Sequence, residues 1–267
     1  MKKILLLIFL LITSILCAEY VGKEEAIKML QQAKAEDYPE SNEIYISNGI
    51  VNLDEYCLGY KISESYKKIL TEGAKKDNSV LFWYDTNYGE KEVLSIELIK
   101  KSGEIISFDP NEILQEKDNS FMGWSNIYSE TSKILTAEIP NIEIGDIVYT
   151  KEKYIIKKAV MENNFFSAFN IEPWSRYLND YLEINIPKSK KLFVHEINKK
   201  DFPYNFSREE KDGNIIYCWN TQNNPKIIYE PNMEMFNLLW TQIWANWLYF
   251  LLDSRVAYFY NHMLLLL

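Results

Sequence analysis

Hydrophobic and polar residues alternate along most of the chain, which is the pattern of β-strands that bury one face and expose the other. Turn-prone residues separate the alternating segments, such as Asn48-Gly49 and Asn52 after the first and Lys101 to Glu104 in a later hairpin. Many short strands at this spacing predict a mainly β fold, an antiparallel β-sandwich with Greek-key-like connections. The expected strands cover residues 43–51, 54–62, 93–99, 105–108, 134–139, 147–156, 181–186, 192–197 and 215–219.

Three segments depart from this period of two. Residues 23–37 carry Ala26, Ile27, Leu30 and Ala33 at helical spacing, and Tyr38-Pro39 follows, so they predict a short amphipathic helix. Residues 63–76 fit a helix or a strand that ends near a turn, and both alternatives stay open. Residues 112–123 are polar without either period, which predicts an exposed excursion between strands.

The first 18 residues have the pattern of a secretory signal peptide: Lys2 and Lys3, then an aliphatic run, then Ser14 to Ala18. The apolar stretch from Ile4 to Leu16 is shorter than the roughly 20 residues that span a bilayer. We therefore expect cleavage after Ala18 and export to the periplasm or cell envelope of a bacterium. Lipidation of Cys17 is a less favoured alternative, because Leu16 stands where lipoprotein processing prefers a small residue.

The last segment, residues 236–267, lacks a polar face. Its only charged residues are Asp253 and Arg255, and it contains Trp240, Trp244 and Trp247. Three interpretations compete: a helix buried against the domain, a membrane-associated segment, or a tail that does not continue the domain. Polar residues between 237 and 246 weaken the membrane interpretation, so we expect a helical, apolar tail that can be removed without unfolding the sandwich.

The charge balance excludes one class of partner. The chain of 267 residues has 29 Lys and Arg against 38 Asp and Glu, a net charge of −9, and cleavage of the leader removes two lysines and gives −11. This charge repels phosphate backbones, so nucleic acid is not an expected partner.

Candidates for nucleophilic or metal chemistry are scarce. After removal of the leader, Cys57 and Cys218 are the remaining thiols, and His195 and His262 are the two histidines. A cysteine nucleophile needs a neighbouring base and a third group that orients this base, and a zinc site needs three or four ligands. The two cysteines and two histidines are not spaced like a catalytic triad or like a set of zinc ligands. We expect no catalytic, cofactor-binding or metal residue, with two buried, unpaired thiols favoured over a disulfide.

Carboxylate pairs and aromatic residues offer two weaker hypotheses. Two carboxylate pairs, Asp109 with Glu112 and Glu143 with Asp146, could flank a glycosidic bond or hold calcium. Each pair lies beside a Pro or Gly turn, however, so we expect them to be solvated turn residues. Aromatic rings could stack on envelope sugars, although core packing is favoured for them. These rings are Trp83, Tyr84, Tyr88 and Trp124.

Successive short blocks of the sequence resemble one bacterial family. They include Tyr38 to Tyr45, Lys68 to Gly73, Ile144 to Tyr149, Gly213 to Trp219 and Tyr229 to Pro231. The family is the uncharacterised domain that precedes transglutaminase-like cores in envelope proteins. The resemblance implies an immunoglobulin-like β-sandwich over about Tyr38 to Asn232.

The resemblance also shapes the expected domain organisation and function. We expect a signal peptide at 1–18, a helix at 19–37, the β-sandwich at 38–235 and the apolar tail at 236–267, the last as the truncated or frame-shifted start of a transglutaminase-like core. The Cys, His and Asp of such a core are not carried over to any position here. The expected function is a non-catalytic module that binds a transglutaminase-like core or another envelope protein; the alternatives are a cysteine-dependent enzyme and a glycan-binding module.

Overall fold

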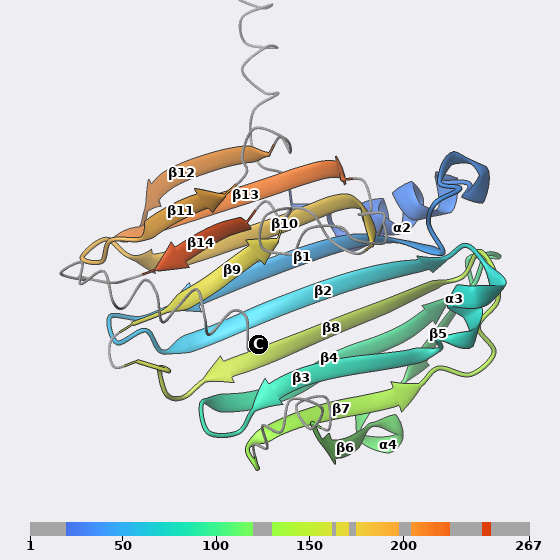
Figure 1. Cartoon of the computed structure of the whole chain (residues 1–267), viewed down its shortest axis with the longest axis horizontal. Coiled ribbons are helices and arrows are strands. Elements are labelled where there is room, and N and C mark those ends of the chain that lie inside the picture. Colours follow the sequence, from blue (N-terminus) through green and yellow to red (C-terminus); the bar gives the residue numbers. More distant parts are fainter. Residues whose placement is uncertain are drawn as a thin grey trace, which may run out of the picture.

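The computed structural model describes residues 20–119, 130–161, 164–170, 175–197, 204–224 and 242–246. Within them the mainly β prediction is confirmed (Figure 1). The elements in chain order are α2 (Lys23–Gln32), η2 (Ala35–Asp37), β1 (Glu43–Leu53), β2 (Gly59–Ile69), α3 (Glu72–Lys76), β3 (Ser79–Asp85), β4 (Gly89–Ile99), β5 (Ile105–Phe108), α4 (Pro110–Ile113), β6 (Gln115–Asp118), β7 (Ser132–Glu138), β8 (Ile147–Ile156), β9 (Phe166–Asn170), β10 (Arg176–Pro187), β11 (Phe193–Ile197), β12 (Asn205–Lys211), β13 (Asn214–Asn224) and β14 (Gln242–Asn246).

Eight of these strands form one large sheet in the order β12-β13-β10-β1-β2-β8-β4-β5. Its pairs are antiparallel except at the centre, where β1 and β10 run parallel and pair from Ile44 with Arg176 to Asn52 with Asn185. The expectation of an antiparallel sheet is therefore wrong at this pair, because β10 arrives after a long connection and not from a hairpin. One sheet of eight strands also differs from the two smaller antiparallel sheets of an immunoglobulin-like sandwich.

Two three-stranded antiparallel sheets accompany the large one, in the orders β3-β7-β6 and β11-β14-β9. In Figure 1 both lie in front of the large sheet, and α2 lies behind it. The residue parity agrees: Ile44, Ile46 and Tyr66 pack with α2, whereas Val148, Ile96 and Leu98 pack with β3 and β7. The large sheet is thus covered by the helix on its back face and by smaller sheets on its front face.

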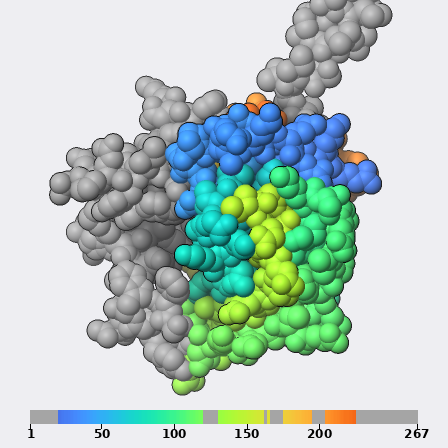
Figure 2. All heavy atoms as spheres, turned by 90° about the vertical axis from the view of Figure 1, so that its right-hand side faces the viewer, coloured from blue at the N-terminus to red at the C-terminus, as the bar shows by residue number. Residues whose placement is uncertain are grey.

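The end of the sheet beside α3 is closed by short segments. Ala74 on α3 and Ile139 and Ile142 after β7 are buried there, in the core that the large sheet shares with β3 and β7. Figure 2 shows this end, where the blue segment around α2 covers the top and the green segment after β4 covers the right side.

The first hairpin differs from its predicted position. β1 continues through Asn48-Gly49, because the buried Asn48 amide donates a hydrogen bond to the Val21 carbonyl at 2.8 Å and Gly49 packs beside Leu182. The chain turns later, where the Asp54 carboxylate accepts the amide N–H groups of Tyr56 and Leu58 at 2.8 and 2.9 Å. An Asx-type turn, and not the Asn-Gly pair, ends the strand.

Two uncertain segments are settled by the structure. The ambiguous stretch 63–76 is mostly strand: β2 runs to Ile69, and the five-residue α3 follows with the Thr71 hydroxyl accepting the Ala74 N–H at 3.3 Å as its N-cap. Of the polar stretch 112–123, residues 120–123 lie outside the described residues. The described part is largely exposed, as predicted, but it contains the edge strand β6, which pairs with β7, and is not wholly irregular.

Most of the predicted leader and tail lies outside the described residues. Of the tail, only β14 is described, and it is a strand that pairs with β9 and β11, where a helix was expected. In the described part of the chain, the helices are too short for a membrane span.

Candidate functional site

The structure keeps the two candidate thiols apart and unpaired. Cys57 is buried in the apolar core around Trp219, and this burial raises its pKa to about 12. Cys218 lies on β13, where its sulfur accepts a hydrogen bond from the Tyr181 hydroxyl at 3.3 Å, and burial raises its pKa as well. Neither thiol has the lowered pKa of a nucleophilic cysteine.

The histidines and carboxylate pairs do not meet at one place. His195 belongs to β11 and His262 lies outside the described residues. Within the described ranges, no group of three or more His, Cys, Asp or Glu side chains could hold a metal ion. Asp109 caps the short helix α4 by accepting the Asn111 N–H at 2.9 Å, and Glu112 lies in the first turn of that helix.

The other carboxylate pair corrects an expectation. Asp146 is 1% exposed, not solvated: it accepts the N–H groups of Lys101 and Glu143 at 2.9 and 2.8 Å and pairs with Lys100 at 2.5 Å. Glu143 is exposed and pairs with Lys75 at 2.7 Å. Asp146 therefore holds the loop before β8 in place, which is a structural role.

The aromatic candidates gather on and after β3. Trp83 is 42% exposed and lies on the strand face that alternates with the buried Phe82. The Tyr84 hydroxyl donates to the Glu116 carboxylate on β6, and Tyr88 lies in the turn before β4. Trp124 lies outside the described residues. Of these rings, Trp83 is exposed on β3, whereas the Tyr84 hydroxyl is already engaged by Glu116, so the glycan hypothesis rests mainly on Trp83.

The most distinctive site is a polar stripe on the front face of the large sheet. This face is apolar at both ends, under β3 and β7 at one end and around Leu182, Ile184 and Trp219 at the other. Between the two cores, the registers of β1, β2, β8 and β10 place hydroxyl and charged side chains side by side. They are Ser47 on β1, Lys61, Ser63, Ser65 and Lys67 on β2, Thr150 and Glu152 on β8, and Asp180 on β10.

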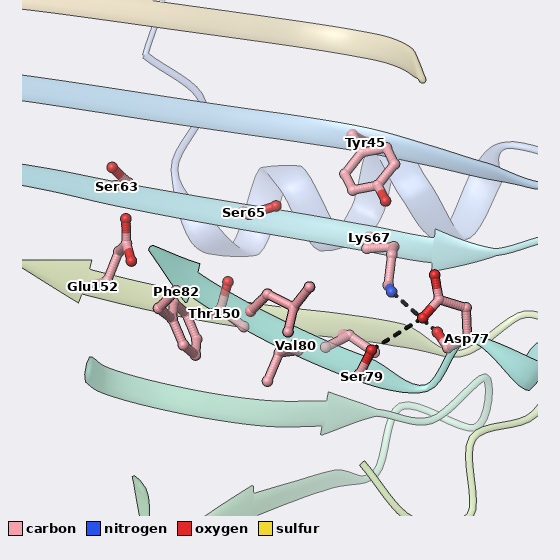
Figure 3. A pocket seen from close by; sticks show the side chains of 12 residues that line it. Tyr45, Ser63, Ser65, Lys67, Asp77, Ser79, Val80, Phe82, Thr150 and Glu152 are labelled. Carbon is pink, nitrogen blue, oxygen red and sulfur yellow. Dashed lines mark hydrogen bonds between the residues drawn. The ribbon is translucent and has the colours of Figure 1, made fainter. Parts of the chain in front are cut away.

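This stripe forms the floor of a groove beside β3. Figure 3 shows Ser63, Ser65 and Thr150 on the floor, with Val80 and Phe82 on the β3 wall. This part encloses about 330 Å³, and a second part of about 410 Å³ continues past Leu81 to Lys61 and Glu152. At the near end, Lys67 donates to the Asp77 carbonyl at 3.5 Å and the Ser79 hydroxyl donates to the Asp77 carboxylate at 3.1 Å.

Charged groups of both signs occupy the other end of the groove. The Lys91 ammonium, whose side chain is 6% exposed, pairs with Glu152 at 2.7 Å. Burial raises the pKa of Asp180 to about 7. A hydrogen bond with Ser47 and the charge of Lys61 both lower this pKa, but their effect is smaller than that of burial. Lys61 borders the groove. Desolvation lowers the pKa of its ammonium group, whereas the nearby charges of Glu152 and Asp180 raise it. Perturbed groups of opposite sign in one groove are typical of a binding site.

Sequence reasoning missed this site because its members are ordinary residues on separate strands. The signal was present in β2, where Lys61, Ser63, Ser65 and Lys67 repeat a polar residue at every second position. In a sheet that is covered on both faces, a row of polar side chains is unusual, because burying polar groups costs free energy unless they find hydrogen-bond partners. The coverage of both faces, however, became visible only in the structure.

The fold and groove define a β-rich domain with a large mixed sheet. Residues 60–228 match DUF3857, described as a domain of unknown function with a solved structure, and because the match spans more than half of the chain, this chain belongs to that family. No curated protein matches the sequence.

A solved structure shares the fold at low sequence identity. A putative protease from Parabacteroides distasonis is 15% identical with a TM-score of 0.66, over 76% of this chain and 40% of the protease chain. This chain therefore spans less than half the length of that protein. An M1 zinc metallopeptidase from Deinococcus radiodurans is 7% identical over 76% of this chain and 42% of its own, with a TM-score of 0.36, which is too low to support an argument.

Proposed function

We propose that this chain is a non-catalytic, exported module that serves as an accessory or interaction domain for a protease-like or transglutaminase-like catalytic core of the cell envelope. The observation that carries the proposal is the similarity of its fold to one part, 40% of the length, of a putative protease. The sequence blocks shared with the domain that precedes transglutaminase-like cores support the same association. The leader-like pattern of residues 1–18 supports export.

The chemistry of the described residues supports a non-catalytic role. Cys57 and Cys218 have raised pKa values, and a thiol attacks as its thiolate. Glu152 and Lys91 neutralise each other in a close pair. The groove therefore offers hydrogen bonds and charges of both signs to a ligand, but no activated nucleophile among these groups.

A direct assay tests this proposal. The purified full chain should show no peptidase or transamidase activity above that of buffer, and Cys57→Ala with Cys218→Ala should leave this background unchanged. Thiol-dependent turnover that the double variant abolishes would show instead that the protein is a cysteine enzyme. Far-ultraviolet circular dichroism of both proteins confirms that the comparison is between folded molecules.

A further inference from the structure

The wall of the groove is a strand with one open edge. β3 pairs with β7 over its whole length, from Ser79 with Glu138 to Asp85 with Ser132, and has no strand partner on its other edge among the described residues. Strand edges of this kind accept further strands, because their N–H and C=O groups point outward in the plane of the sheet.

The register fixes which backbone groups point into the groove. The Ile139 N–H donates to the Asn78 carbonyl and the Thr86 N–H donates to the Thr131 carbonyl, both at 2.9 Å, so residues with even numbers bond to β7. The N–H and C=O groups of Ser79 and Leu81 therefore point away from β7. The Asp85 carbonyl follows the same rule and accepts the Tyr154 hydroxyl from β8 at 3.2 Å.

The floor below this edge has the chemistry of a peptide-binding surface. Hydroxyl groups of Ser63, Ser65 and Thr150 lie under the open side, so they can bond to side chains or backbone of an added chain. The groove carries charges of both signs, with three ammonium groups and four carboxyl groups, which does not favour a polyanion. These groups are Lys61, Lys67, Lys91, Asp77, Asp85, Glu152 and Asp180.

Sugar stacking has less support in this groove. Five aromatic rings line the two parts of the groove, and four of them already have other contacts. Tyr45 stacks on Tyr177 with centroids 5.2 Å apart, Phe82 is 5% exposed within the core below β3, the Lys91 ammonium lies 5.6 Å from the Tyr154 ring centroid, and the Tyr84 hydroxyl donates to Glu116. Trp83 is 42% exposed, but it lies on the β3 wall and not on the floor. A glycan ring needs a broad exposed aromatic face, whereas an extended peptide needs an open strand edge and a polar floor.

We propose that the groove binds an extended peptide segment of a partner protein, which adds as a strand to the open edge of β3 and places alternate side chains on the hydroxyl floor. The pairing rests on the backbone groups of Ser79 and Leu81. A strand that covers these two residues and extends one residue beyond each contains about five residues, or roughly 17 Å at 3.4 Å per residue. This inference deepens the proposed function, on which it rests only in taking the segment from a partner protein.

The test uses the full chain and a fluorescein-labelled, capped heptapeptide, Lys-Thr-Val-Thr-Val-Thr-Glu, followed by fluorescence anisotropy. The expected result is saturable binding that Leu81→Pro weakens at least about tenfold, because proline removes an N–H that faces the groove and not β7. Leu81→Ala is the matched control: it keeps the N–H and should change the Kd less than about threefold.

A second arm keeps the test valid if Leu81→Pro fails to fold. The same heptapeptide with N-methylated amides at every second residue, offered to the wild-type chain, should lose binding because one edge of the peptide can no longer pair. Equal binding of the methylated peptide would overturn the proposal, as would no binding at about 1 mM peptide. Binding of chitohexaose in place of the peptide would overturn it in favour of a glycan site. Cleavage of a bound peptide would contradict the non-catalytic function and leave the peptide site intact.

Discussion

Two lysines on β2 face opposite sides of the large sheet and have different surroundings. Lys68 points to the back face, where it is 8% exposed and donates to the carbonyls of Leu30 and Ala33 at 2.7 Å and of Gln31 at 3.4 Å. It completes the C-terminal end of α2, whose last carbonyls lack partners within the helix. Lys61 points to the front face and borders the groove.

The carboxylates of the two faces differ in the same way. On the back face, Glu64 pairs with Lys151 at 2.8 Å and accepts the Tyr20 hydroxyl at 2.7 Å, and these bonds lower its pKa although burial alone would raise it. On the front face, burial prevails at Asp180 and raises its pKa. The back face therefore satisfies its buried charges, whereas the front face combines the close Lys91–Glu152 pair with one carboxyl, Asp180, whose pKa burial raises. Such mixed and perturbed charges are found at binding sites.

The largest expected effect comes from the back face. Lys68→Met should lower the free energy of unfolding by about 2–3 kcal/mol, because the carbonyls at the end of α2 lose their donor while they stay buried. Lys61→Met, the matched change on the front face, should cost less than about 1 kcal/mol. Urea unfolding followed by circular dichroism measures both. Equal losses would show that the two faces do not differ in this respect.

A smaller effect concerns pH. The raised pKa of Asp180, about 7 against an ordinary value of 3.8, means that the folded protein keeps a proton that the unfolded chain has released between these values. This contribution to stability is complete below the unfolded pKa and is lost as the pH rises through about 7.

The pH effect can be isolated with two variants. Between pH 5 and pH 8, the melting temperature of the wild type should fall more than that of Asp180→Asn. The extra fall should be about 3 °C for each kcal/mol of unfolding free energy that the wild type loses when Asp180 releases its proton. Asp77→Asn, an exposed carboxyl at the other end of the groove, should keep the wild-type dependence. An identical pH dependence in Asp180→Asn and wild type would contradict the account of Asp180.

Sequence patterns predicted the strands that have one apolar and one polar face. They failed where contacts between distant parts of the chain determine the local structure. The segments 105–108 and 147–156 are observed as β5 and β8 with the predicted bounds. β3 was missed because Val80 to Tyr84 is apolar on both faces, so no alternation marks it. The turn at Asn48-Gly49 was wrongly predicted because the packing of Gly49 against Leu182 is a long-range contact. The groove lies between strands distant in the sequence, so no local pattern could reveal it.

The central claim is that the polar floor of the groove is kept for a ligand and not for stability. Its most direct test is the melting temperature of the double variant Ser63→Val with Ser65→Val, with and without the labelled heptapeptide. Valine favours strands and removes two polar groups from a half-buried floor, so the variant without peptide should melt at the wild-type temperature or about 2 °C above it. Added peptide should raise the melting temperature of the wild type but not of the variant. A variant that melts several degrees lower, and that peptide still stabilises, would contradict the account.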